Sequence, residues 1–291
     1  MSAFQTRTSR HAAAMAQTVF LTGASSGIGR ATAELLSARG FEIWATSRDV
    51  GRLPALPGLH PLELDFERPE TIDAAWNRAL GEACHFDIVV QNAGAGIFGS
   101  IEDVPSEEAA RQWQILVESP LRLLRLAAAH MRPRRAGVIV GVSSLAAELP
   151  MPFAAHYSAG KAALSALLGG LEMELKPFGV RVVDLRPGDF RTAFNDRIAP
   201  AGTGTSPYAP WTAAAWKEAV RLMNEAPGPE LAARAILDVI EQPRPLARCG
   251  TFFQARLGAL GVRLLPRSSL LDSIRRYYHL DRVDREAGKT P

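Results

Sequence analysis

The sequence predicts an α/β protein with a doubly wound parallel sheet, formed as a single domain with a lid and a helical extension after the sheet. Three observations predict it. Short aliphatic runs alternate with stretches of helical spacing from Val19 to Leu185, as in parallel sheets that helices cover on both faces. A glycine-rich turn follows the first run. The length of 291 residues also suits one such domain.

Each element follows from its pattern of apolar residues. Buried parallel strands are predicted at Val19–Leu21, Phe41–Ala45, Leu62–Leu64, Ile88–Val90, Val138–Val142 and Val180–Leu185. Helices are predicted between them at Gly29–Arg39, Pro69–Cys84, Glu107–Met131 and Tyr157–Lys176. After Pro187 we expect a mobile loop at Ala199–Pro210 around Thr203 and Tyr208, then helices at Trp211–Asn224, Glu230–Ile240 and, amphipathic, Arg256–Tyr278.

These elements predict three segments. Residues 1–17 form a disordered extension, residues 18–250 the catalytic unit with a lid at about 193–228, and residues 251–291 a basic helical extension. The first segment contains Arg7, Arg10 and His11 but no acidic residue, so a transit peptide is an alternative. Translation from Met15 is another.

Composition narrows the classes of function. No apolar run approaches the roughly 18 residues of a membrane span, which favours a soluble protein. Cys84 and Cys249 lack metal-ligand spacing, so we expect a reducing, cytoplasmic compartment and no metal site. Net charge is +3, with ten basic and five acidic residues from Glu241 onward. A solvated helix face explains this basic tail best, weak contact with acidic lipid or a partner is the alternative, and no nucleic-acid partner is expected.

The glycine-rich turn predicts a dinucleotide site. Gly23 allows a tight turn, Gly27 lets a pyrophosphate approach the backbone, and Gly29 lets the helix pack closely on the strand. Free N–H groups at the helix start bind the anion. The contact residues expected here are Gly23, Ser25, Ser26, Gly27, Ile28 and Gly29. This Gly-x-x-x-Gly-x-Gly spacing resembles the short-chain dehydrogenase/reductase family, a similarity that covers about Thr18 to Thr192 and implies a Rossmann-type fold and a nicotinamide cofactor.

The end of the second strand predicts which nicotinamide cofactor binds. Ser47 stands where NAD-preferring sites carry an acid, and Arg48 follows it. A hydroxyl and a guanidinium suit a 2′-phosphate, so we expect NADP(H). The alternative is that Arg48 faces solvent and Asp49 binds the ribose. The family resemblance further implies cofactor contacts from Asp65, Asn92, Ala93, Gly94, Pro187, Gly188 and Thr192.

Three side chains form the expected catalytic group. Tyr157 and Lys161 are one helical turn apart and therefore share a face. The ammonium, with oxidised nicotinamide, is expected to lower the pKa of the tyrosine from its usual value near 10. Ser144 ends the fifth strand, at the sheet edge where ligands bind. The resemblance implies that Ser144 polarises a carbonyl while Tyr157 exchanges the proton and Lys161 also binds the nicotinamide ribose.

The chain departs from the family pattern at three positions. Leu116 replaces an asparagine that joins the lysine to solvent through a water, so the proton relay is rerouted, slowed or absent. Gln91 also replaces an asparagine but keeps an amide. Gly160 replaces a common serine, with little expected cost beyond helix propensity.

The sequence favours an apolar substrate, a ketone, aldehyde or secondary alcohol of steroid, retinoid or acyl type. Expected pocket residues are Phe98, Leu149, Met151, Phe153, His156 and Phe194, with Trp211 and Trp216 from the lid. The competing interpretation is a nucleotide-binding sensor or scaffold that has lost turnover with the missing asparagine. The family resemblance implies a homodimer or homotetramer.

Overall fold

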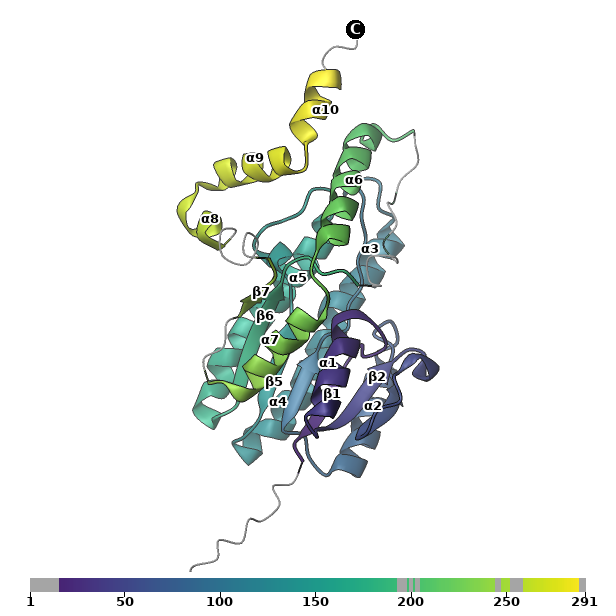
Figure 1. Ribbon diagram of the computed structural model, residues 1–291, viewed down its shortest axis with the longest axis vertical. Helices are drawn as coiled ribbons and strands as arrows, with labels where there is room; N and C mark the ends of the chain where they lie inside the picture. Colours follow the sequence, from purple (N-terminus) through teal and green to yellow (C-terminus); the bar gives the residue numbers. More distant parts are fainter. Residues whose placement is uncertain are drawn as a thin grey trace, which may run out of the picture.

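The computed structural model describes residues 16–192, 198, 201, 205–243, 247–251 and 259–287. Within them, seven parallel strands form one sheet in the order β3-β2-β1-β4-β5-β6-β7 (Figure 1). The strands are β1 (Thr18–Leu21), β2 (Glu42–Ser47), β3 (Leu59–Glu63), β4 (Ile88–Gln91), β5 (Val138–Val142), β6 (Arg181–Pro187) and β7 (Arg248–Cys249). The order changes direction between β1 and β4, where doubly wound sheets bind ligands. The predicted fold class is confirmed.

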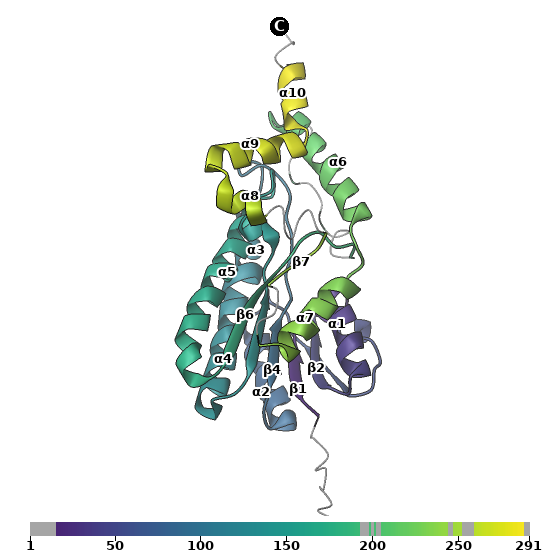
Figure 2. The ribbon, with the colours of Figure 1, turned by 60° about the vertical axis from the view of Figure 1, so that its left-hand side comes forward.

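Helices cover both faces of the sheet, which explains why its strands are continuously apolar (Figure 2). One face carries α1 (Gly27–Ala38) and α7 (Glu230–Glu241), and the other carries α2 (Glu70–Ala83), α4 (Ser119–Arg134) and α5 (Ala155–Leu175). Leu36 and Ile236 are fully buried in the first core. Phe20, Trp76 and Leu168 are buried in the second. Two apolar layers therefore fix the sheet that supports the site.

The third strand lies earlier in the chain than predicted. It spans Leu59–Glu63 rather than Leu62–Leu64, and its register pairs Ile43 with Leu59 and Ser47 with Glu63. The apolar pattern does not reveal this strand because it contains His60 and Pro61, and proline is rare in central strands. β3 is an edge strand, where proline is tolerated.

The predicted helix Glu107–Met131 is three segments in the structure. It begins as α3 (Ser106–Trp113), continues as a π-helical segment, η2 (Gln114–Glu118), and ends as α4 at Arg134. Hydrophobic spacing does not distinguish a π turn from an α turn over five residues. The irregular segment contains Leu116, so it lies where the sequence departs from the family pattern.

The described residues after β6 add helices above the carboxyl end of the sheet (Figure 1). They are α6 (Ala209–Glu225), α8 (Ala259–Leu264), α9 (Arg267–Tyr277) and α10 (Leu280–Ala287). Within the predicted amphipathic segment Arg256–Tyr278, Pro266 separates α8 from α9. The last helix, α10, lies in the predicted helical extension, whereas the two-residue β7 was not predicted.

Some predictions lie outside the described residues. They concern residues 1–15, Phe194, Thr203 and the beginning of the Arg256–Tyr278 segment. Among the helices that the structure describes, none has the length and apolar character needed to cross a bilayer.

Candidate active site

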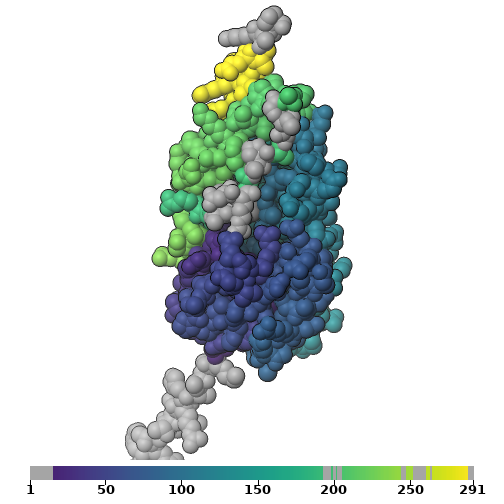
Figure 3. Space-filling view, turned by 90° about the vertical axis from the view of Figure 1, so that its right-hand side faces the viewer, coloured from purple at the N-terminus to yellow at the C-terminus, as the bar shows by residue number. Residues whose placement is uncertain are grey.

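A cavity of about 1410 Å³ opens at the carboxyl end of the sheet and runs up to the C-terminal helices. Figure 3 shows one side of the molecule, with the purple and blue N-terminal part below and green α6 above. Of the residues predicted to bind cofactor or to catalyse, every one except Gly29 lines this cavity. One continuous space therefore joins the glycine turn to Ser144, Tyr157 and Lys161.

The glycine turn has the backbone geometry that a close-fitting anion site needs. Gly23 and Gly27 adopt φ of 71° and 54°, which other residues rarely adopt. A Cβ atom on Gly27 would lie 3.0 Å from Cβ of Thr192, which also lines the cavity. On Gly29 it would lie 2.2 Å from the carbonyl oxygen of Gly23. Gly29 therefore permits helix packing, whereas Gly23 and Gly27 shape the wall. A dinucleotide pyrophosphate fits here, at the start of α1.

Asn92 holds this turn from the neighbouring strand end. Its side-chain amide donates to the carbonyl oxygens of Thr22 at 3.0 Å and Gly23 at 3.3 Å. Its backbone N–H donates to the Thr22 hydroxyl at 2.9 Å. Asn92 thus shapes the turn besides lining the cavity.

The other end of the dinucleotide site contains two arginines. Arg48 and Arg52 both line the cavity beside Ser47, and Nη1 of Arg48 lies 3.3 Å from a Glu67 oxygen. The carboxylate of Asp49 accepts the Gly51 N–H at 3.0 Å and so caps the short helical turn that follows. This local bond gives Asp49 a role other than binding ribose.

Ser144 and Tyr157 are hydrogen-bonded to each other at the base of the cavity. Ser144 also accepts the Ala146 N–H at 3.1 Å, which fixes its rotamer. Lys161 is buried one turn along α5, with Nζ 5.9 Å from the centre of the Tyr157 ring. The ammonium donates to the carbonyl oxygen of Val142 at 2.8 Å. The three side chains predicted to act together are therefore brought together.

Burial shifts the pKa values of Tyr157 and Lys161. It raises the pKa of Tyr157 to about 12, although the hydrogen bond from Ser144 acts in the opposite direction. Burial also lowers the pKa of Lys161 to about 8, while the negative charge of Asp184 raises it. The expected lowering of the Tyr157 pKa is not produced by the protein alone, because removal of water from the phenol outweighs the hydrogen bond from Ser144 and the charge of Asp189 raises the pKa further.

Leu116 lies beside Lys161, where the resemblance implied an asparagine. A Cβ atom on Gly94 would be 3.4 Å from Cδ2 of Leu116 and 3.6 Å from Nζ of Lys161. The leucine is fully buried. Leu116 therefore offers no polar atom to hold a water in this region of the site.

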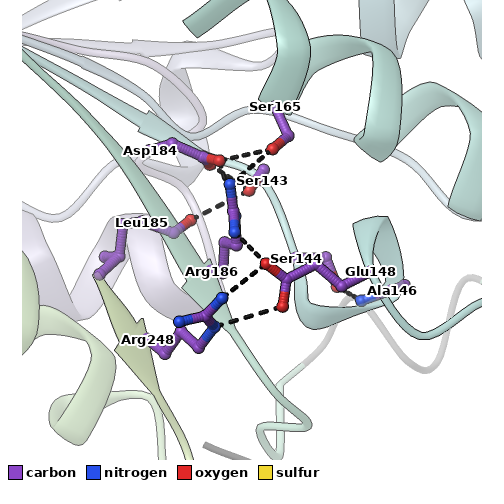
Figure 4. A network of polar contacts seen from close by, with 9 residues as sticks. All are labelled: Ser143, Ser144, Ala146, Glu148, Ser165, Asp184, Leu185, Arg186 and Arg248. Carbon is purple, nitrogen blue, oxygen red and sulfur yellow. Dashed lines mark hydrogen bonds and ion pairs between the residues drawn. The ribbon is translucent and has the colours of Figure 1, made fainter. Parts of the chain in front are cut away.

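A network of charged side chains lies beside Ser143, the residue that precedes Ser144 (Figure 4). Asp184 on β6 accepts hydrogen bonds from Ser143 and, at 2.6 Å, from Ser165, one turn beyond Lys161 on α5. Arg186 pairs with Asp184 at 2.7 Å and also with Glu148. Glu148 follows the short helix that Ser144 caps, and it pairs with Arg248 on β7 at 2.6 Å. The sequence analysis missed this network because its members lie far apart in the chain.

The far wall of the cavity was only partly predicted. Phe98, Leu149, Met151 and Trp216 line it as expected, whereas Phe153, His156 and Trp211 do not. Phe153 and Trp211 instead pack in the apolar cluster beside it. The residues that sequence reasoning missed are Ala219, Leu222, Met223, Leu265, Leu270, Ile274, Tyr277 and Tyr278. Leu270, Ile274 and Tyr277 share one helical face, a spacing that the sequence displays but that is equally typical of core packing.

Known proteins resemble the chain in sequence and in fold. Residues 17–202 match the family model described as short chain dehydrogenase. A 3-ketodihydrosphingosine reductase of Bacteroides thetaiotaomicron is 31% identical over 184 residues, or 62% of this chain and 66% of that protein. An NADPH-dependent 1-acyldihydroxyacetone phosphate reductase of Schizosaccharomyces pombe is 32% identical over 198 residues, or 66% of this chain and 65% of that protein. The chain thus spans just under two thirds of the length of these relatives.

A solved structure resembles nearly the whole chain. The crystal structure of a short-chain dehydrogenase from Streptomyces avermitilis has a TM-score of 0.76 and 28% sequence identity, and it covers 96% of this chain and 100% of that one. The similarity in fold therefore extends beyond the residues that match the family model.

Proposed function

Because the chain belongs to the short-chain dehydrogenase family, we propose that it is an oxidoreductase that moves a hydride between NADP(H) and a hydrophobic ketone, aldehyde or secondary alcohol. The observation that carries this proposal is the hydrogen-bonded pair Ser144–Tyr157, with Lys161 one turn away, in the cavity that contains the glycine turn.

The residues suggest how carbonyl reduction would proceed. Bound NADPH supplies the hydride that reduces the carbonyl carbon. The Ser144 hydroxyl donates a hydrogen bond to the carbonyl oxygen and holds it near Tyr157. The Tyr157 hydroxyl then gives its proton to that oxygen, which becomes the alcohol. Lys161 supplies the positive charge that stabilises the phenolate left behind. Alcohol oxidation reverses these steps.

The preference for NADP(H) rests on the end of the site at β2. Ser47, Arg48 and Arg52 line it, and the carboxylate nearest in sequence, that of Asp49, is bonded to Gly51. Two guanidinium groups and a hydroxyl suit a 2′-phosphate. The Schizosaccharomyces pombe relative is described as NADPH-dependent, which supports the same assignment.

The proposal extends to the surroundings of the site. Residues 193–228, which include α6, act as the lid over the substrate. By resemblance to the family, two or four copies of the chain assemble, and they act in the cytoplasm.

The first test follows NADPH and NADH absorbance over a panel of hydrophobic ketones and aldehydes. We expect turnover with NADPH, and a loss of at least about a hundredfold in kcat for Tyr157→Phe, the usual effect of removing a general acid. The matched control is Tyr208→Phe, which also removes one hydroxyl, but from an exposed tyrosine bonded to Glu102. Equal losses in the two variants would contradict the role given to Tyr157.

One observation favours the competing function of a nucleotide-binding sensor or scaffold. Leu116, which like Lys161 lies near Gly94, has no polar atom to hold a water of a proton relay. Tight NADPH binding without turnover of any carbonyl, unrescued by Leu116→Asn, would establish that function. Turnover by the wild-type chain would exclude it.

A further inference from the structure

Helix α9 has two chemically different faces. Leu270, Ile274 and Tyr277 line the cavity, at positions that helical geometry places on one side. Leu271, which follows Leu270 in the chain, is exposed, as are Arg275 and Arg276. The helix is therefore a wall of the cavity and not merely a solvated basic tail.

The opposite wall is α6, and packing between the helices fixes the distance between the walls. Tyr278 and Leu280 are buried in one apolar cluster with Ala215 of α6 and with Phe98 below it. Polar contacts add to this packing, since the Trp211 indole N–H donates to Asp284 at 2.8 Å. The C-terminal helices are thus attached to α6 by buried side chains, so the two walls form one packed unit.

The surfaces that α6 and α9 turn towards the cavity are apolar, although Asp189, which interacts electrostatically with Tyr157 and Tyr277, lines the same cavity. From residue 205 onward, the described residues that line the cavity include no charged side chain. On α6 they are Trp216, Ala219, Leu222 and Met223. Ser273 and Tyr277 are the α9 residues lining it that carry a hydroxyl, and Ser273 donates to the carbonyl oxygen of Ser269 at 2.7 Å. Such walls favour hydrocarbon over a charged or sugar-bearing substrate.

The cavity has room for a substrate beside a dinucleotide. Its 1410 Å³ exceeds the roughly 300–1,000 Å³ that is typical of a site for one small molecule. Tyr157 belongs to the same cluster of side chains as Ile274 and Trp216, so the apolar space begins at the reacting group.

We propose that the carbonyl substrate carries a long, uncharged hydrocarbon chain, which lies between α6 and α9 while its carbonyl oxygen meets Ser144 and Tyr157. This inference rests on the proposed reductase function and adds the class of substrate. It assigns to the C-terminal helices the selection of the length of the substrate's hydrocarbon chain. The net positive charge of that segment does not predict this role.

The test measures kcat/KM with NADPH for methyl ketones from butanone to dodecanone, with cyclododecanone as a bulky comparison. We expect kcat/KM to rise roughly two- to fourfold for each added methylene, as each one enters apolar space. The linear twelve-carbon ketone is expected to exceed the cyclic one at least about tenfold. A flat series, or preference for the ring, would overturn the proposal.

Two neighbouring leucines give a matched pair of variants. Leu270→Gln places an amide in the cavity and should lower kcat/KM for dodecanone about tenfold or more, with butanone little affected. Leu271→Gln makes the same change on the exposed face and should leave both substrates unchanged. Equal effects of the two variants would contradict the assignment of α9. NADPH affinity, measured by fluorescence, verifies that each variant is folded.

A variant with a larger side chain tests the proposal if Leu270→Gln does not fold. Ser273→Phe narrows the space between the walls and should move the preferred ketone to a shorter chain. An unchanged chain-length optimum would overturn the proposal. Absence of NADPH oxidation with every ketone, butanone included, would instead count against the reductase function itself.

Discussion

Leu116 and Gly160 are in direct contact where the π-helical segment crosses α5. A Cβ atom on Gly160 would lie 2.9 Å from Cβ and 2.8 Å from Cδ1 of Leu116. Real Cβ atoms are not found this close to their neighbours, so residue 160 has to be glycine as long as the two segments remain at this distance. The sequence analysis treated this glycine as nearly neutral, and the structure shows that helix packing requires it.

Substitution of glycine by alanine along α5 should therefore have opposite effects at two positions. Gly160→Ala should lower the free energy of unfolding by about 1–3 kcal/mol, the usual cost of overpacking. Gly169→Ala, two to three turns further along, should raise it by about 0.5–1 kcal/mol, because that position has open space and alanine favours the helix. Urea unfolding measures both. A stabilising Gly160→Ala would show that the two segments separate easily.

The buried Lys161 should make stability depend on pH. Its pKa is about 8 in the folded protein, against a usual 10.5, so between these values the unfolded chain binds one more proton. Stability should consequently rise with pH through this window, by about 3 kcal/mol if the shift is fully expressed. Tyr157 remains protonated in both states below about pH 9. Burial raises the pKa of Cys249 from 9.0 to about 12, so this thiol opposes the rise above about pH 9, and the contribution of Lys161 is measured below that pH. Urea unfolding of the cofactor-free protein at pH 7 to 10 measures the rise. The same rise in Lys161→Met would assign it to another group.

Asp184 should determine the pH at which the rise in stability due to Lys161 begins. Its charge raises the pKa of Lys161, so Asp184→Asn should lower that pKa further and move the rise in stability to lower pH. Asp87→Asn is the matched control. Asp87 is also partly buried and bonded to a hydroxyl and an arginine, Thr18 and Arg134, but it precedes β4 at the opposite end of the sheet. A general loss of stability with no movement of the window would give Asp184 a purely structural role.

Ser47 should determine the choice between the two nicotinamide cofactors. Ser47→Asp places a carboxylate where we propose that the 2′-phosphate binds, and it should lower kcat/KM for NADPH at least about tenfold, equivalent to 1.4 kcal/mol. NADH, whose ribose hydroxyl can donate to the new carboxylate, should gain relative to NADPH. Ser37→Asp is the control, since Ser37 is half-buried and donates to the carbonyl oxygen of Pro57, and it does not line the cavity. Unchanged preference in Ser47→Asp would place the phosphate elsewhere.

The sheet and the positions of the candidate catalytic residues could be predicted because their signals are local. Aliphatic runs such as Val138–Val142 are buried on both faces of the sheet, and glycine at positions 23 and 27 has few alternatives to a tight turn. Tyr157 and Lys161 lie one turn apart on any helix. In each case a few adjacent residues determine the geometry.

The remaining features depend on contacts between distant parts of the chain. The pairing of Glu148 with Arg186 and Arg248 exists only after β6 and β7 join the sheet. Likewise, the spacing of Leu270 and Ile274 predicts an apolar face but not which surface it meets. The basic residues of the last segment indicate only its solvent-exposed side, whereas the side that lines the cavity is apolar.

The order of the strands also bears on how the protein is made. Each strand pairs with one that precedes it in the chain, so the sheet can extend from β1 as residues leave the ribosome. The helices that form the far walls of the cavity, α6 and α9, are synthesised after β6. The glycine turn and the Tyr157–Lys161 pair are therefore synthesised before the second wall. The residues proposed to hold the dinucleotide precede, in the order of synthesis, those that enclose the space beside it.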